Sequence, residues 1–532
     1  MVGTMEETSR IPGYFKNKGI LITGATGFLG KILVEKILRV QPDVKRIYLP
    51  VRAPDAESAK KRVETEVIGK ELFGLLRETH GKGFRSFIEE KVVPLAGDII
   101  HENLGVEGPQ LSQMTRELNV IVNGAATTNF YERYDVALDV NVLGVKHICQ
   151  LAKQCPNLEV VLHVSTAYVV GEKQGVILER AFKQGETLRE TEAELDIDAE
   201  LRLARDYQRQ VAGDDAEQKN ERKAMKELGL ARAREFGWPN TYVFTKAFGE
   251  MMLARELGAG RRRPRRDRAA QHYHQHPEGA AARVGRRHQD HRRHPHRLRQ
   301  AEPLLLPGRP PAHHGRDRID HTLAISTFKS LHQPTNKWPQ IPGDMVVNAM
   351  MAATVAHASS SAPADQQKKT TPPPTVYHAT SSLRNPAPYA VLYRTGLRYF
   401  SDHPRVGKDG RPVRTRKVHF FGTVAGFTAY MVLRYRLPLE LLRLLSLLCC
   451  GLLFSRLYAD LDRKYRFVMR LVDLYGPFAL FRGIFDDANV ERLRMAMPVA
   501  DRVEFNFDPK TVDWDDYFYK IHIPGVMKYV LN

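Results

Sequence analysis

The segment from Thr23 to Gly30, with the sequence TGATGFLG, constrains the fold of this 532-residue chain more than any other. A short apolar run at 19–22 precedes it, and apolar residues recur at helical spacing from Leu29 to Leu38 after it. This order of strand, glycine-rich turn and helix predicts a dinucleotide-binding loop, whose helix N-terminus receives a pyrophosphate. The alternative interpretation is an ordinary turn. The loop residues predicted to bind the cofactor are Thr23, Gly24, Thr26, Gly27, Phe28, Leu29 and Gly30.

Further apolar runs at 47–51, 92–95, 120–122 and 160–164 alternate with helix-compatible stretches. This alternation predicts an α/β fold of the Rossmann type, with a doubly wound parallel sheet. Ligands of such sheets bind at the carboxyl ends of the strands. Asp98 and Ala125 follow two of the predicted strands, so both are candidate cofactor-binding residues.

Arg52 lies at the end of the second predicted strand, about 20 residues after the glycine loop. An acidic residue there favours NAD, because it can hydrogen-bond the ribose 2′-hydroxyl, whereas arginine suits the 2′-phosphate of NADP. Arg52 therefore favours NADPH as the cofactor. The nearby residues 60–62 are all basic, and they either add to this positive field or form a solvated helix face.

Tyr242 and Lys246 are four residues apart in a helix-compatible segment, so their side chains share one helix face. A lysine ammonium can lower the pKa of a neighbouring phenol, which then serves as a proton donor near neutral pH. Ser165 and Thr166 end the 160–164 strand and could polarise a substrate carbonyl, and we favour Thr166. The predicted catalytic residues are therefore Tyr242, Lys246, Thr166 and Ser165. Tyr242 and Lys246 are also expected to contact the cofactor.

These motifs together resemble the extended short-chain dehydrogenases/reductases, and within them the alcohol-forming fatty acyl-CoA reductases of the plant type. The resemblance covers nearly the whole chain except 259–340. It is carried by the segments 123–148, 163–173, 238–252, 341–353, 377–386, 470–494 and 513–530.

The resemblance implies that NADPH reduces a long-chain fatty acyl-CoA to a primary fatty alcohol, with release of CoA and an aldehyde as intermediate. Tyr242 would be the general acid, Lys246 would bind the nicotinamide ribose, and Ser165 or Thr166 would orient the carbonyl. The alternatives are a catalytically impaired, lipid-associated NADP-binding protein and another extended short-chain reductase. The resemblance also implies a smaller, mainly helical C-terminal domain that helps to bind the acyl chain.

The net charge of +19 is concentrated in one segment, because residues 259–320 hold 16 Arg, no Lys and only six acidic residues. Residues 259–303 contain too few large apolar side chains to build a helix or strand, so we expect disorder there. Family-like peptides appear when plausible codons of this segment are read in another frame, and we interpret 259–340 as frameshifted. A basic arm for nucleic acid or anionic lipid is the alternative, although the absence of lysine argues against it, and no nucleic-acid partner is expected.

We expect an NADP-binding reductase domain at 1–355, a linker at 356–375 and the C-terminal domain at 376–532. The apolar stretch 437–454 is predicted to be a tunnel wall, a membrane-contact helix or an ordinary buried helix. The N-terminus has neither a signal-peptide nor a transit-peptide pattern. We therefore expect a cytoplasmic protein or one associated peripherally with the endoplasmic reticulum membrane. The four cysteines lack zinc-site spacing, so no metal is expected.

Overall fold

A seven-stranded sheet forms the core of the fold, and all its neighbouring strands run parallel. The computed structural model describes residues 9–189, 195–211, 218–258, 269–275, 337–358, 374–405, 421–448 and 454–529. The strand order is β3-β2-β1-β4-β5-β7-β9. The strands are β1 (Gly19–Thr23), β2 (Arg46–Val51), β3 (Val92–Ala96), β4 (Leu118–Asn123), β5 (Val160–Thr166), β7 (Ala269–Gln275) and β9 (Thr375–His378).

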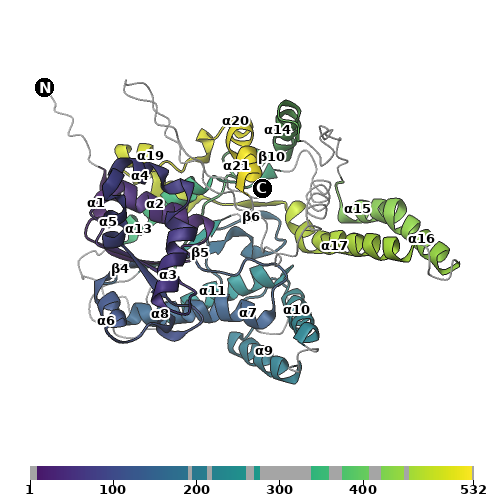
Figure 1. The fold of residues 1–532 in the computed structure, drawn as a ribbon, viewed down its shortest axis with the longest axis horizontal. Helices are drawn as coiled ribbons and strands as arrows, with labels where there is room; N and C mark the ends of the chain where they lie inside the picture. The colour runs from purple at the N-terminus through teal and green to yellow at the C-terminus, as the bar shows by residue number, and fades with distance from the viewer. Residues whose placement is uncertain are drawn as a thin grey trace.

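Helices cover both faces of this sheet (Figure 1). Side chains alternate along β1, so that Ile20 and Ile22 belong to one apolar cluster and Leu21 to the opposite one. Strands buried on both faces read as continuous apolar runs, which is why the sequence predicted them. On one face lie α1 (Arg10–Phe15), α2 (Phe28–Val40), α3 (Ala56–Val63), α4 (Gly74–His80), α5 (Phe84–Lys91) and α13 (Gly343–Ala358). On the other lie α6 (Gly108–Glu117), α8 (Gly144–Gln154) and α11 (Thr241–Gly258). The predicted Rossmann-type fold is confirmed.

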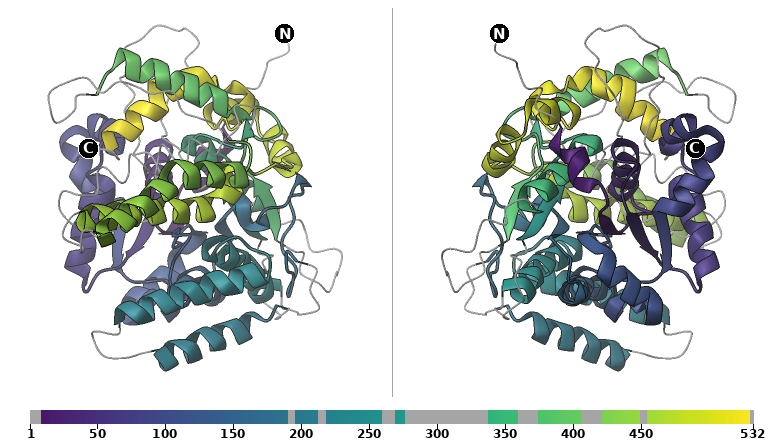
Figure 2. Two further views of the ribbon diagram at one scale, coloured as in Figure 1. Left: turned by 90° about the vertical axis from the view of Figure 1, so that its right-hand side faces the viewer. Right: turned by 90° about the vertical axis from the view of Figure 1, so that its left-hand side faces the viewer.

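The chain between β5 and α11 adds a layer of helices beside α11. It contains α9 (Ile197–Val211) and α10 (Gln218–Glu235), which pack on each other and on α7 (Tyr134–Leu138). Figure 2 shows α9 and α10 at one end of the molecule. This layer and α11 share an apolar cluster centred on Trp238 and Phe244.

Residues 269–275 correct one of our expectations, because they form strand β7 although the sequence predicted no strand there. β7 lies between β5 and β9 and pairs with both. Backbone N–H and C=O groups pair whatever the side chains are, so the two flanking strands can hold a segment that lacks an apolar pattern. The remainder of 259–340 up to residue 336 lies outside the described residues.

The C-terminal region is mainly helical, as the sequence predicted, but it is not separate from the sheet. β9 is a strand of the main sheet, and Leu493, Met497 and Phe505 belong to the same apolar cluster as α2 and α13. Two small sheets add further links, namely β6 (Gly175–Ile177) with β11 (Gly483–Phe485), and β8 (Lys337–Trp338) with β10 (Ala387–Pro388). The helices of this region are α14 (Tyr389–Asp402), α15 (Val424–Met431), α16 (Leu437–Leu448), α17 (Ser455–Ala479), α18 (Ala488–Met495), α19 (Val499–Glu504), α20 (Trp514–Tyr517) and α21 (Ile523–Tyr529).

Helices α15, α16 and the first half of α17 form an arm that stands away from the sheet (Figure 1). The arm has a small apolar cluster of its own, in which Phe427 and Met431 of α15 meet Val468 and Val472 of α17. Among the described residues, no helix combines the length and the apolar character needed to cross a membrane. The predicted alternative of a buried helix at 437–454 is wrong for α16, because most of its leucines are exposed.

Candidate active site

The glycine loop connects β1 to α2 at the centre of the sheet, where the chain switches from strands on one side of β1 to strands on the other. Gly24 has a φ of 73°, and a Cβ there would lie 2.8 Å from the backbone of Gly124. A Cβ at Gly30 would lie 2.7 Å from the Cα of Ala25. Only glycine fits either position, so the turn remains tight enough to leave room for a ligand at the start of α2.

The start of α2 offers its backbone N–H groups to an anion. Its N-cap, Gly27, has no side chain to cap these groups, and Gly27 itself is exposed. Thr26 and Phe28 are half-buried beside it, and Leu29 is buried beneath the loop. Uncapped N–H groups and the positive end of the helix dipole suit a pyrophosphate. The loop therefore fits the dinucleotide that the sequence predicted.

The other predicted cofactor-binding residues lie at the ends of neighbouring strands. Arg52 is exposed after β2, and the half-buried Asp98 accepts a hydrogen bond from the N–H of Ile100 after β3. The N–H of Ala125 donates to Oγ1 of Thr23 over 3.1 Å. Thr23 is buried, and its hydroxyl joins β1 to the end of β4. The residues predicted to contact the cofactor after β2, β3 and β4 thus lie at the carboxyl ends of neighbouring strands.

The predicted catalytic residues meet where α11 crosses the end of β5. Tyr242 is 3% exposed and hydrogen-bonds to the side chain of Thr166, which is fully buried. Lys246 lies one turn further along α11, and its Nζ donates to the carbonyl oxygen of Val164 over 2.7 Å. The structure therefore supports the preference for Thr166 as the hydroxyl beside Tyr242. Ser165, which follows Val164, points to a different partner.

That partner is Glu250, which the sequence analysis missed. Oγ of Ser165 donates to Oε1 of Glu250 over 2.5 Å, and Glu250 is fully buried. Glu250 follows Lys246 by four residues, so Tyr242, Lys246 and Glu250 form one polar stripe along a helix that is otherwise largely apolar. This spacing was visible in the sequence and is the signal that could have identified Glu250.

Burial changes the acidity of all three groups on this stripe. It raises the pKa of Tyr242 well above its usual value, and the hydrogen bond with Thr166 opposes this only in part. It lowers the pKa of Lys246 to about 8, although the charge of Glu250 opposes the change. It raises the pKa of Glu250 to about 8, against the effects of Ser165 and Lys246. The expectation that Lys246 lowers the pKa of Tyr242 is therefore wrong for this structure, because burial dominates.

A chain of buried hydrogen bonds runs from the glycine loop to His163, which lies next to Lys246. Oγ1 of Thr23 donates to Oδ1 of Asn123 over 2.8 Å, and Nδ2 of Asn123 lies 3.1 Å from Nδ1 of His163. Because an amide nitrogen can only donate, Nδ1 accepts and the ring hydrogen of His163 lies on Nε2. Nε2 lies 3.5 Å from Nζ of Lys246. The sequence analysis did not identify Asn123 or His163, because each looks like an ordinary strand residue.

Phe130 connects Tyr242 to aromatic rings of helix α17. The ring of Tyr242 stacks on Phe130 at a centroid distance of 5.5 Å, and Phe130 stacks on Tyr475 at 4.7 Å. Phe478 lies 5.2 Å from Phe130 and 5.0 Å from Tyr168. The C-terminal region therefore contributes aromatic rings to an apolar wall that reaches Tyr242 through Phe130.

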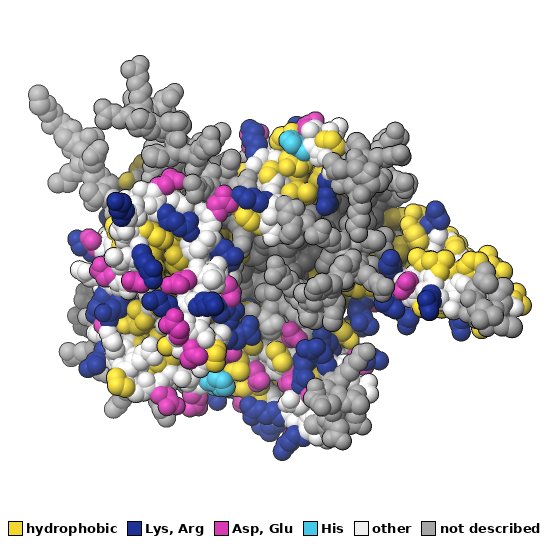
Figure 3. Space-filling model, in the orientation of Figure 1, with side chains coloured by type: hydrophobic (Ala, Val, Ile, Leu, Met, Phe, Trp, Pro, Cys, Tyr) yellow, Lys and Arg dark blue, Asp and Glu magenta, His cyan; other side chains and the backbone are white. Residues whose placement is uncertain are grey.

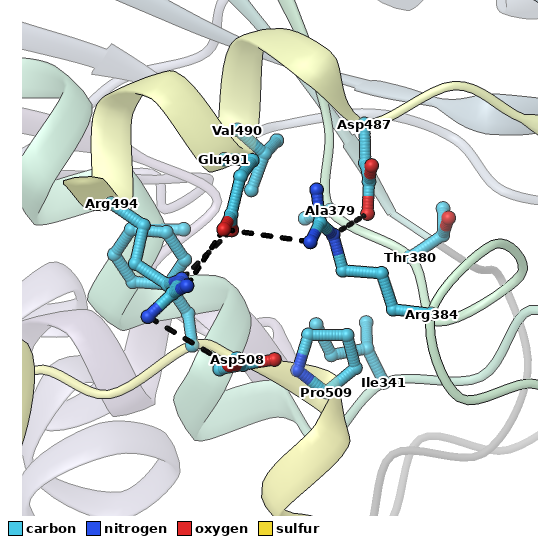
Figure 4. Close-up of a pocket in the computed structure, with 12 residues that line it drawn as sticks. Ile341, Ala379, Thr380, Arg384, Asp487, Val490, Glu491, Arg494, Asp508 and Pro509 are labelled. Carbon is cyan, nitrogen blue, oxygen red and sulfur yellow. Dashed lines mark hydrogen bonds and ion pairs between the residues drawn. The ribbon is translucent and has the colours of Figure 1, made fainter.

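A separate pocket lies between α13, α18 and residues 507–509 (Figure 4). Two arginines line it, and both are paired with acidic side chains. Arg384 lies 2.6 Å from Asp487, and Arg494 lies 2.7 Å from Glu491 and 3.7 Å from Asp508. None of the predicted catalytic residues lines this pocket. Its ion pairs join separate segments of the C-terminal region to one another, which suits a structural junction.

The site can transfer a proton from a neutral phenol to an oxygen atom in a dry, apolar setting. Tyr242 could donate this proton, its hydroxyl is hydrogen-bonded to Thr166, and Lys246 lies one helical turn away on the carbonyl oxygen of Val164. Among the residues that the structure describes, no group of histidine, cysteine or acidic side chains could hold a metal ion. The placement of Tyr242, Thr166 and Lys246 near the glycine loop suits carbonyl reduction beside a bound dinucleotide.

Comparison with known proteins identifies relatives along the whole chain. An NAD-binding family model described as male sterility protein matches residues 22–262, and a second model of the same description matches 434–532. The domain around the glycine loop is thus a nicotinamide-dinucleotide-binding domain. Fatty acyl-CoA reductase 1 of Arabidopsis thaliana is 40% identical, with 98% of each chain covered. The alcohol-forming fatty acyl-CoA reductase of Simmondsia chinensis is also 40% identical, with 99% of this chain and 100% of that protein covered.

Solved structures with the same fold are reductase domains of large synthetases. The terminal reductase domain of the myxalamid pathway superposes with a TM-score of 0.52 at 14% identity, covering 96% of this chain and 91% of that one. The reductase domain of a nonribosomal peptide synthetase from Mycobacterium tuberculosis gives 0.50 at 16% identity, covering 97% and 93%. At these identities the comparison supports the fold alone.

Proposed function

The chain belongs to the fatty acyl-CoA reductases, a family of oxidoreductases, and from this premise we propose that it reduces a long-chain fatty acyl-CoA to the primary alcohol. One observation carries the proposal. Tyr242 shares a face of α11 with Lys246 and hydrogen-bonds to Thr166 at the end of β5, near the glycine loop. The aromatic wall from α17 gives this proton donor the apolar surroundings that an acyl chain requires.

NADPH is the proposed cofactor, and when bound it supplies the hydride for each of two reductions. Arg52 supports the choice of NADPH, because its exposed guanidinium stands at the end of β2, where a 2′-phosphate would need a cation. The N–H groups at the start of α2 would hold the pyrophosphate. Lys246 would bind the nicotinamide ribose, and Asp98 and Ala125 would flank the rest of the cofactor.

Tyr242 is proposed to donate its phenolic proton to the carbonyl oxygen in each reduction. Its raised pKa keeps the phenol neutral, so the proton is in place when negative charge develops on that oxygen. In the first reduction a hydride adds to the carbonyl carbon and the proton of Tyr242 adds to the oxygen, which gives a hemithioacetal. Its C–S and O–H bonds then break, the proton passes to sulfur, and CoA leaves as the thiol with an aldehyde as the other product. Tyr242 regains a proton from solvent before the second reduction. The second reduction converts the aldehyde to the alcohol. Thr166 orients the carbonyl, and Ser165 acts by holding Glu250.

The proposed setting is a membrane surface, either that of the endoplasmic reticulum or another surface reached from the cytoplasm. Both the acyl chain and the alcohol product partition into lipid. A peripheral protein could therefore take its substrate from the membrane and release its product into it. No nucleic-acid partner is proposed.

The test is to incubate purified full-length protein with a long-chain acyl-CoA and either NADPH or NADH. We expect fatty alcohol by gas chromatography, free CoA thiol in equal amount, and faster turnover with NADPH. Tyr242→Phe is the matched control, because it removes only the hydroxyl. Binding of NADPH without alcohol formation by the wild-type protein would contradict the proposal and support a catalytically impaired protein.

A further inference from the structure

Helix α16 carries its apolar face outward. Leu437, Leu441, Leu444 and Leu448 are 54%, 59%, 58% and 80% exposed, whereas Ser446 is only 7% exposed. At 100° per residue these leucines form one continuous stripe along the helix. A surface helix of a globular protein normally turns such a stripe toward the core. No described residue covers the stripe, and Figure 3 shows it as an apolar surface on the arm.

The stripe is not needed to hold the arm together. Helix α16 packs against α17, and its Leu439 is buried at 6% exposure. Arg436, just before α16, adds an ion pair with Asp462 of α17 over 2.9 Å. The apolar cluster of the arm is made by α15 and α17 instead. The exposed leucines therefore represent apolar surface beyond what the fold uses, and surface of this kind marks a site of interaction.

The arm that carries the stripe has an excess of basic residues. Residues 434–470 hold eight Arg and Lys residues and only three acidic ones. Arg443 is 57% exposed on α16, and Arg456 is exposed at the start of α17, near further exposed apolar side chains at Leu457 and Leu461. Leucines flanked by arginines are typical of a helix that lies in the interface of a bilayer with anionic lipids.

We propose that the stripe on α16, with the adjoining exposed leucines of α17, inserts into the interface of an anionic lipid surface. The helix has 12 residues, which span about 18 Å and so fall short of the ~30 Å hydrocarbon core. It therefore lies along the surface of the membrane. A second copy of this chain is the less suitable occupant, because two-fold pairing through this face brings the same arginines together.

The arm is continuous with the catalytic site through α17. This helix begins at Ser455 beside the exposed leucines and ends at Ala479, just beyond Tyr475 and Phe478. These two rings pack on Phe130, which stacks on Tyr242. Docking of the arm would thus fix the orientation of the aromatic wall of the site relative to the lipid surface. This last step rests on the proposed reductase function, whereas lipid binding by the arm does not.

The test measures sedimentation of the full-length protein with vesicles of phosphatidylcholine, with and without phosphatidylserine. The variant combines Leu437→Ser, Leu441→Ser and Leu444→Ser. We expect its partition onto anionic vesicles to fall by about tenfold or more, because three side chains lose their transfer out of water. A matched control makes three equivalent changes at exposed apolar residues away from the arm, Leu178→Ser, Val499→Ser and Val503→Ser, and should bind as the wild type does.

A second variant, Arg443→Gln with Arg456→Gln, should weaken binding to vesicles with phosphatidylserine more than to those without it. Unchanged vesicle binding by the leucine variant would overturn the proposal. So would a wild-type dimer that the leucine variant converts to a monomer, since the stripe would then belong to a second copy. Alcohol formation from soluble acyl-CoA is measured in parallel. If the wild type binds vesicles but makes no alcohol, the proposed reductase function is refuted, whereas the proposed binding of lipid by the arm is retained.

Discussion

Glu250 should make the stability of this protein fall as the pH rises through the neutral range. Its carboxyl group is buried against Ser165, and burial raises its pKa to about 8 from the ordinary value of 4.5. Between these two values the folded protein keeps the proton and the unfolded chain has lost it. The folded state then binds more protons than the unfolded state, so the free energy of unfolding decreases with increasing pH.

The size of the effect follows from this one-proton difference. A full proton corresponds to about 1.4 kcal/mol per pH unit, which sets the steepest slope between pH 4.5 and 8. Glu250→Gln removes the titration but keeps an oxygen that accepts from Ser165. Lys246 does not obscure the result, because its pKa falls from 10.5 to about 8 and its own contribution changes only above that pH.

The assay is urea unfolding of the wild type and Glu250→Gln at several pH values between about 5 and 7.5. The variant should gain stability relative to the wild type as the pH rises, by up to about 1.4 kcal/mol per unit. Glu256→Gln is the matched control, because Glu256 lies on the same helix but pairs with Lys153 at the surface. If the free energies of unfolding of the wild type and Glu250→Gln change in parallel with pH, Glu250 does not titrate as proposed.

Four further changes test the site. Tyr242→Phe should lower kcat by about 10²–10⁴-fold with NADPH affinity retained, as fluorescence titration would verify, and an unchanged kcat would contradict its role as acid. Thr166→Val should reduce kcat more than Ser165→Ala, since Thr166 bonds to the tyrosine and Ser165 to Glu250; the reverse order would reassign the two hydroxyls. Gly30→Val should abolish NADPH binding in the same titration, because its side chain collides with the Gly24–Ala25 backbone, and normal affinity would argue against the loop as the cofactor site. Arg52→Glu should shift the kcat/KM ratio from NADPH toward NADH by about tenfold or more, and an unchanged ratio would remove Arg52 from the cofactor site.

The sequence predicted the first five strands closely, because each is buried on both faces and reads as a run of apolar residues. The sequence did not predict β7. This strand is held by backbone pairing with β5 and β9, and its sequence has no apolar pattern that would indicate a strand. The sequence also failed to predict that β9 joins the main sheet. A pairing between residues 271–274 and 375–378 spans about a hundred positions, and no local pattern reports such a contact.

The site was predictable where spacing alone decides the geometry. Tyr242 and Lys246 share a helix face because they are four residues apart, and Thr166 ends the neighbouring strand. The direction of the pKa shifts was not predictable, since it depends on complete burial of α11 beneath other elements. Asn123 and His163 were missed for a related reason: their connection through hydrogen bonds exists only once β4 and β5 lie side by side.

The position of β9 bears on any attempt to dissect this protein. A fragment that stops after α13 loses the strand beside β7, and it exposes the surface that Leu493 and Phe505 cover. A fragment that begins at β9 carries a strand without its sheet. Neither piece is a self-sufficient folding unit, so truncations placed between the two matched segments should yield insoluble protein. Nucleotide binding and the lipid-facing arm are thus properties of one cooperative structure that can be separated only by point substitutions.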